Sequence, residues 1–133
     1  MPDFVFIKDK NLSYTAPPYN PPVRYLESGD VFNEFDKTNN IYDSVRKLFI
    51  KMGLDSENIG TAKWNPFRGL IKDNYKIVIK PNMVLEESGK NVGKKCTTTQ
   101  ADIIRPILDY IYLLKISERI NVEVRICDVP IQG

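Results

Sequence analysis

Two short segments of the sequence place polar side chains where strands are expected to end. The first is Lys80-Pro81-Asn82, which follows a β-branched run. Proline has no N–H and holds the preceding residue extended, so Pro81 should end the strand and direct Lys80 outward. The second is Asp128, which follows an alternating apolar run. An ammonium and a carboxylate at such ends could bind an anion, move a proton or hold a hard cation.

A threonine run, Thr97-Thr98-Thr99, leads into the segment between these two strands, which reads as a helix. The free N–H groups and positive dipole end of a helix N-terminus favour anions. In an open parallel sheet, ligands bind outside the carboxyl ends of the strands. We therefore predict a site for a small anionic molecule there, with Asp128 as a base or as the holder of a hard cation. The predicted ligand-binding residues are Lys80, Asn82, Thr97, Thr98, Thr99 and Gln132.

A purely structural role stays open for each of these residues. Lys80 and Asp128 could form an ion pair that closes the sheet edge. The threonines could only cap the helix, and Asn82 could only be a turn residue. The sequence requires no cofactor and predicts no metal site. Cys127, within the second strand, is expected to be an inert core residue.

Composition excludes several classes of function. The sequence has no histidine, which excludes Ser-His-Asp and Cys-His catalysis and His-ligated zinc within this chain. Its net charge of +2 is too small to favour a nucleic-acid partner. Apolar runs are too short to span a membrane, and the N-terminus lacks the pattern of a secretory signal. A cytoplasmic protein with two reduced cysteines is therefore expected.

Hydrophobic periodicity predicts the elements that must position the site. Apolar residues at helical spacing predict a helix over 40–52, capped by Asn40 and stopped by Gly53. The irregular segment that follows should be anchored on the core by Trp64 and Phe67.

The last sixty residues or so read as strand, helix and strand. The strands are expected over 75–80 and 120–127, and the helix over 99–117. Thr99 and Asp102 fit a capping box, while Pro106 should kink the first turns. Such a βαβ unit predicts two parallel strands joined by a right-handed crossover.

The chain divides into two parts on composition. Residues 1–38 form a Pro/Tyr-rich extended arm, with a possible first strand over 4–7. The arm either lies over the domain or serves as a polyproline ligand. Residues 39–133 are predicted to be an α/β domain with a small, mostly parallel sheet and helices packed on it, truncated at its C-terminal end.

Several of these motifs together resemble the domain of unknown function 362 family. The likeness covers roughly residues 40–133. It is carried by Ile79-Lys80-Pro81-Asn82-Met83-Val84, the threonine-rich approach to the helix, and Asp128-Val129-Pro130-Ile131-Gln132-Gly133. Two further segments, Asn58-Ile59-Gly60-Thr61 and Trp64-Asn65-Pro66, resemble members found beside surface-polysaccharide genes.

The resemblance implies a bacterial or archaeal cytoplasmic protein of several hundred residues, of which this chain is the amino-terminal part. Some members carry iron–sulfur modules, but this sequence has no such cysteine cluster. The family has no settled activity, so no catalytic residue is carried over from it.

Three functions remain open from the sequence. The leading one is the anion-binding part of an enzyme. The alternatives are a non-enzymatic redox or assembly module of a polysaccharide locus and an inactive truncated product. The expected partners are a small anionic molecule and a second copy of the chain, which would associate through an uncovered sheet edge or an exposed apolar patch.

Overall fold

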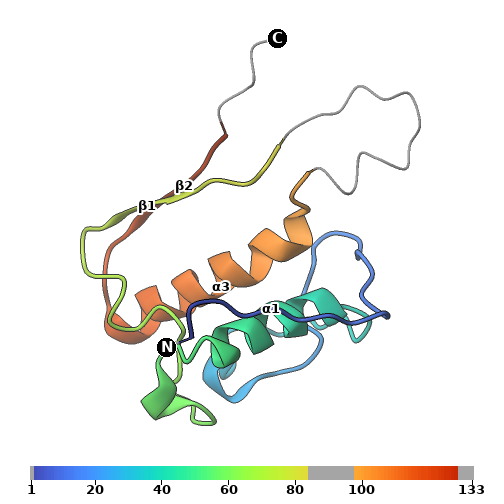
Figure 1. Cartoon of the computed structure of the whole chain (residues 1–133). Helices are drawn as coiled ribbons and strands as arrows, with labels where there is room; N and C mark the ends of the chain where they lie inside the picture. The colour runs from blue at the N-terminus through green and yellow to red at the C-terminus, as the bar shows by residue number, and fades with distance from the viewer. Residues whose placement is uncertain (1, 84–97, 129–133) are drawn as a thin grey trace.

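The computed structural model of the chain describes residues 2–83 and 98–128, and it has the expected α/β character (Figure 1). The elements in chain order are η1 (Leu26–Ser28), α1 (Asn40–Lys51), η2 (Ser56–Asn58), β1 (Lys76–Ile79), α3 (Ala101–Glu118) and β2 (Glu123–Ile126). Each predicted helix and strand after residue 39 is present within a few residues of its expected bounds. The strand expected over 4–7 is wrong, because no strand forms in that part of the arm.

The two strands lie parallel, as predicted, with Lys76 opposite Glu123 and Ile79 opposite Ile126. They form a two-stranded sheet, and α3 connects them along the chain. Along β1 the half-buried Ile77 and Ile79 alternate with Val78, which is 62% exposed. One face of the strand is therefore covered and the other faces solvent.

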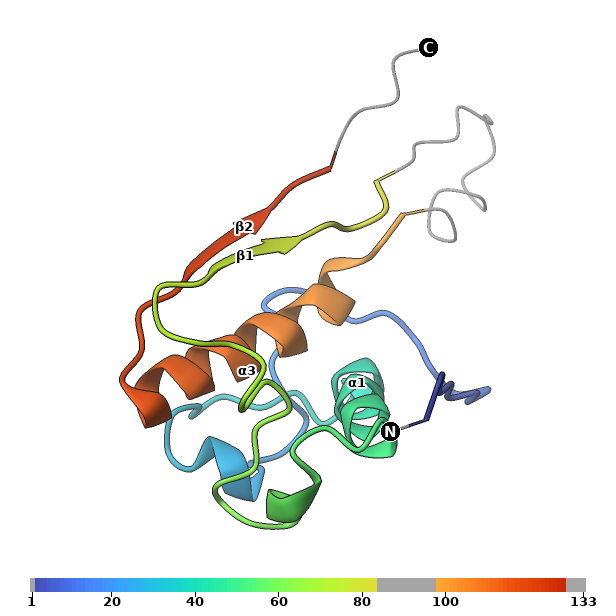
Figure 2. The ribbon, with the colours of Figure 1, turned by 60° about the vertical axis from the view of Figure 1, so that its left-hand side comes forward.

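Helix α3 lies between the sheet and α1, as two views of the ribbon show (Figure 2). The core cluster is centred on Trp64, Tyr110 and Leu113, with Phe49 and Phe67 packed against it. The ring centroids of Trp64 and Tyr110 are 5.4 Å apart in an edge-to-face arrangement. The predicted anchoring role of Trp64 and Phe67 is confirmed. The largest buried side chains thus join α1, α3 and the irregular segment between α1 and β1.

Helix α1 ends as the sequence predicts but begins differently. Gly53 has a φ of 73°, and the N–H of Leu54 donates to the carbonyl of Phe49 at 3.2 Å. This is a Schellman-type ending, which favours glycine because a side chain is strained at positive φ. The expected cap at Asn40 is wrong. The cap is Asn39, whose side-chain oxygen accepts a hydrogen bond from the N–H of Tyr42 at 3.1 Å.

The predicted capping box at the start of α3 is also wrong. The N-cap is Gln100, and its side chain makes no capping hydrogen bond. Asp102 is buried and accepts a hydrogen bond from the N–H of Thr15 in the arm at 3.1 Å. The Asp102 side chain therefore binds the arm and does not cap α3. Further along, α3 continues through Pro106, which is fully buried.

Candidate functional site

Lys80 and Asp128 meet at one edge of the sheet, as their positions in the sequence predict. The Lys80 Nζ lies 2.8 Å from Asp128 Oδ1. Because β1 and β2 are parallel and Ile79 is level with Ile126, the residues that follow both strands come to the same end. The Lys80 side chain is 65% exposed, whereas that of Asp128 is 15% exposed. The carboxylate is therefore largely covered, and the ammonium that it holds faces solvent.

Asp128 also fixes the backbone that leaves β1. Its second carboxylate oxygen, Oδ2, accepts a hydrogen bond from the N–H of Met83 at 2.9 Å. Each oxygen of this carboxylate thus has a donor within the chain. This arrangement holds Lys80 and Met83 in place after β1, and it is the geometry expected of a residue that positions its neighbours.

The segment before α3 pairs with the segment after β1. The N–H of Asn82 donates to Thr99 Oγ1 at 2.9 Å, and the N–H of Thr99 donates to the carbonyl of Asn82 at 2.7 Å. Met83 and Thr98 form an isolated antiparallel bridge beside them. These contacts bring the beginning of α3 to the same end of the molecule as Lys80. They also tie that helix to the strand exit.

The strand-end cluster therefore consists of Lys80, Asn82, Thr98, Thr99 and Asp128. Pro81, between two of them, is buried, as suits a residue that ends the strand. Of the predicted ligand-binding residues, Thr97 and Gln132 lie outside the described residues. The prediction for Cys127 is wrong: its side chain is exposed, because β2 ends at Ile126 and little of the described chain covers the sheet there.

A cluster of this kind can attract and orient a small anion. Lys80 has three N–H donors, and its contact with Asp128 occupies the direction toward the sheet. The opposite charge of Asp128 reduces the net positive charge of the edge, so the attraction for an anion is modest. The first helical residue of α3, Ala101, follows Thr99 closely, and its turn adds N–H groups with a partial positive charge.

The sequence did not reveal a buried charged cluster that joins the arm to both helices. The Glu27 side chain is 2% exposed, and Arg46 binds it with two hydrogen bonds of 2.6 and 3.2 Å. The Tyr110 hydroxyl donates to the same carboxylate at 2.7 Å. The Arg46 guanidinium also lies 4.4 Å from the ring centroid of Tyr25 and 5.1 Å from that of Trp64.

This cluster holds the arm against α1 and α3. It is not a candidate reactive site, because its charges are paired and covered. Burial and the nearby Glu27 carboxylate raise the pKa of Tyr110 far above its usual value. No sequence signal could have found the pairing, since Glu27 lies in the three-residue turn of η1, nineteen residues from Arg46.

A second group of paired charges surrounds a polar hollow of about 370 Å³ beside Trp64. Arg68 is one of the lining residues; it donates to the carbonyl of Lys63 at 2.9 Å and pairs with Glu118. Arg68 Nε also lies 3.5 Å from Asp55 Oδ2. These contacts crosslink the irregular segment to the end of α3.

Comparison of the chain with protein-family models, with curated proteins and with solved structures finds no match. The resemblance to the domain of unknown function 362 family therefore rests on the motifs themselves. Within residues 2–83 and 98–128, no group of three or more metal-ligating side chains comes together. Over the same ranges, no helix combines the length and the apolar character that crossing a bilayer requires.

Proposed function

We propose that this chain is an anion-binding α/β domain and that its ligand is held at the carboxyl ends of β1 and β2. The observation that carries the proposal is the asymmetry of the ion pair. Lys80 is 65% exposed, yet it is anchored to the mostly covered Asp128 at 2.8 Å. A lysine restrained in this way presents a fixed cation to solvent and loses little conformational freedom when a ligand arrives.

Each residue of the strand-end cluster has a role in this proposal. Lys80 binds the anion, and Asn82 and Thr98 orient it. Thr99 secures the strand exit, since its hydroxyl accepts the hydrogen bond from the N–H of Asn82. Asp128 positions Lys80 and Met83 in preference to acting as a base, because both of its oxygens already accept hydrogen bonds or pair with charge.

An ¹⁵N NMR titration with inorganic phosphate, sulfate and acetate tests the proposal. We expect saturable shifts of the amides of Asn82, Met83, Thr98 and Thr99 with dissociation constants in the millimolar range, which is about 4 kcal/mol of binding free energy. The Lys80→Gln variant should lose them. Lys76→Gln is the matched control, since Lys76 begins the same strand on the same face.

Two outcomes would contradict this function. One is the absence of saturable shifts with all three anions. The other is that Lys80→Gln and Lys76→Gln weaken anion binding equally, which would mean that the binding depends only on the net charge of the chain. Either result would leave the ion pair as a device that closes the sheet edge.

We also propose that the chain self-associates through its small sheet. Within the described residues, β1 and β2 pair only with each other, so each strand has an outer edge. Val78 on the open face is 62% exposed, and Ile126 at the end of β2 is 48% exposed. Parallel sheets are normally covered on both faces, so an assembly role for this surface is consistent with its composition.

The family membership and the cytoplasmic location are proposals of the same kind. They rest on the motif order around Lys80-Pro81-Asn82 and Asp128, because the family that these motifs resemble is expected to be cytoplasmic. Fractionation of bacterial cells that produce the tagged chain tests the location. Recovery of the chain from the periplasm or the membrane would contradict it.

A further inference from the structure

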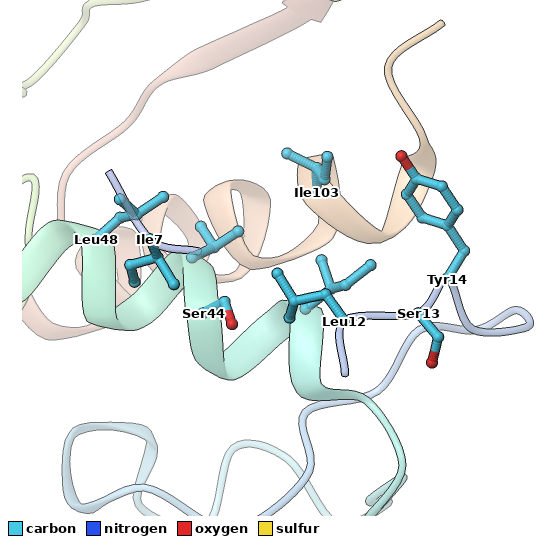
Figure 3. Close-up of a pocket in the computed structure, with 9 residues that line it drawn as sticks. Ile7, Leu12, Ser13, Tyr14, Ser44, Leu48 and Ile103 are labelled. Atoms are coloured by element: carbon cyan, nitrogen blue, oxygen red, sulfur yellow. The ribbon is translucent and has the colours of Figure 1, made fainter. Parts of the chain in front are cut away.

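Side chains of the N-terminal arm, α1 and α3 together line a half-open pocket (Figure 3). A cavity of about 340 Å³ lies there. Its walls include Ile7 and Leu12 of the arm, Val45 and Leu48 of α1 and Ile103 of α3. This volume is within the range of sites that bind small molecules. None of the strand-end residues lines it, although Ile103 follows Thr99 by four positions in the sequence.

The chemistry of the lining selects the class of occupant. The lining side chains are aliphatic except for Tyr14 and two serines, and none of them carries a charge. Water in such a cavity would find few hydrogen-bond partners, which favours an apolar occupant. A charged molecule would lose its hydration without gaining an ion pair, so the occupant should be neutral.

The polar groups of the lining are hydroxyls. They belong to Ser13 and Tyr14 of the arm and to Ser44 of α1. Tyr14 and Ile103 lie at the same end of the lining (Figure 3), so the Tyr14 hydroxyl gives that end both a donor and an acceptor. A hydroxyl group on the occupant can donate a hydrogen bond to the Tyr14 oxygen there.

We propose that this cavity binds a small neutral molecule with an aliphatic body and one hydroxyl group. The aliphatic body lies against Leu12, Val45 and Leu48, and the hydroxyl is directed to the end formed by Tyr14 and Ile103. A medium-chain alcohol is the simplest ligand of this class. The N-terminal arm is one wall of the site, so the arm is part of a binding surface and not only a covering segment.

A ¹³C methyl NMR titration of the full chain tests the proposal with two isomeric ligands. 1-Heptanol has a hydroxyl donor, and 1-methoxyhexane has the same atoms without one. We expect saturable shifts of the methyl groups of Leu12, Val45, Leu48 and Ile103 with the alcohol. Binding of the ether should be several-fold weaker, because it cannot donate a hydrogen bond.

Two substitutions on α1 provide the controls. Ser44→Leu places added volume in the lining and should weaken heptanol binding at least about tenfold. Lys51→Leu adds the same side chain at an exposed position of the same helix and should leave binding unchanged. The fold of both variants is checked by their amide spectra.

The proposal is overturned if the methyl shifts do not saturate, or if folded Ser44→Leu binds heptanol as the unmodified chain does. Equal affinity for the two isomers would overturn the assignment of the hydroxyl. If Ser44→Leu fails to fold, NOEs between the alkyl protons of heptanol and the methyl groups of Val45 and Ile103 decide the matter in the unmodified chain. Their presence supports the site, and their absence overturns it.

Discussion

Glu27 and Arg46 form a two-point ion pair beneath the surface, with Nε to Oε1 at 2.6 Å and Nη2 to Oε2 at 3.2 Å. The pair connects the N-terminal arm to α1, and the Tyr110 hydroxyl extends it to α3. Three segments that are remote in the sequence thus share one carboxylate. The packing of the arm against α1 and α3 depends on this carboxylate.

Removing one partner of this pair should be strongly destabilising. We expect Glu27→Ala to lower the free energy of unfolding by about 2–4 kcal/mol, because Arg46, only 19% exposed, is left without its counter-charge. Chemical denaturation measures the change. Asp30→Ala is the control, since it breaks the exposed Arg24–Asp30 pair and should have little effect. Similar losses for both variants would contradict a special role for Glu27.

Stability should fall at alkaline pH. Burial is the main cause that raises the pKa values of Tyr25, Tyr42 and Tyr110, and nearby carboxylates add to it. A folded-state pKa above the unfolded value gives stability that is fully present below the unfolded pKa, about 10 for tyrosine. That stability is lost as the pH rises above this value toward the folded-state pKa.

Urea denaturation between pH 8 and pH 12 or so checks this expectation. Tyr42→Phe removes one of the three phenols and should reduce the slope of stability against pH above about pH 10. The same variant should be less stable at pH 8, because Tyr42 donates to Asp109 at 3.0 Å. A free energy of unfolding that stays constant up to about pH 12 would contradict the raised pKa values of these tyrosines.

The two partners of the strand-end pair should differ in their effect on stability. Lys80→Ala should change the free energy of unfolding by less than about 1 kcal/mol, because the lysine is mostly exposed. Asp128→Ala should cost about 0.5–1.5 kcal/mol more than Lys80→Ala, because it also removes the acceptor of the hydrogen bond from the N–H of Met83. Denaturant titration of both variants gives the comparison. A large loss for Lys80→Ala would favour a purely structural ion pair.

Self-association should depend on Val78, which has an exposed side chain and an outward-facing backbone. Glu123 N–H donates to the carbonyl of Tyr75, and Cys127 N–H donates to that of Ile79. The backbone N–H and carbonyl groups of the odd-numbered residues between Tyr75 and Ile79 therefore point toward β2. In a parallel pair the N–H and carbonyl of one residue point the same way, so those of Val78 point to the outer edge of β1.

We expect sedimentation velocity to show association of the unmodified chain that increases with concentration. Val78→Pro removes the outward N–H without removing a hydrogen bond to β2, and Val78→Lys places a charge on the open face. One or both should shift the chain toward monomer. Val23→Lys, an equivalent change at an exposed arm position, should not. A monomer at all concentrations would contradict the proposal.

Local sequence patterns were sufficient for the parts of this protein that depend on periodicity. Helical spacing identified α1 and α3, a short β-branched run identified β1, and alternating spacing identified β2. Gly53 marked the end of α1 because positive φ favours glycine there. The meeting of Lys80 and Asp128 also followed from the sequence. Two strands joined by one helix must run parallel, so their carboxyl ends share one edge.

Tertiary packing decided everything that joins irregular segments to these elements. The arm has no period, so its sequence could not indicate that Glu27 would reach Arg46 or that Thr15 would bind Asp102 in place of a capping box. The pocket lined by the arm, α1 and α3 likewise depends on where the arm packs. Cys127 is exposed for a related reason. The alternation of a strand assigns each side chain to one face of the sheet, but only the folded chain determines how much of that face is covered.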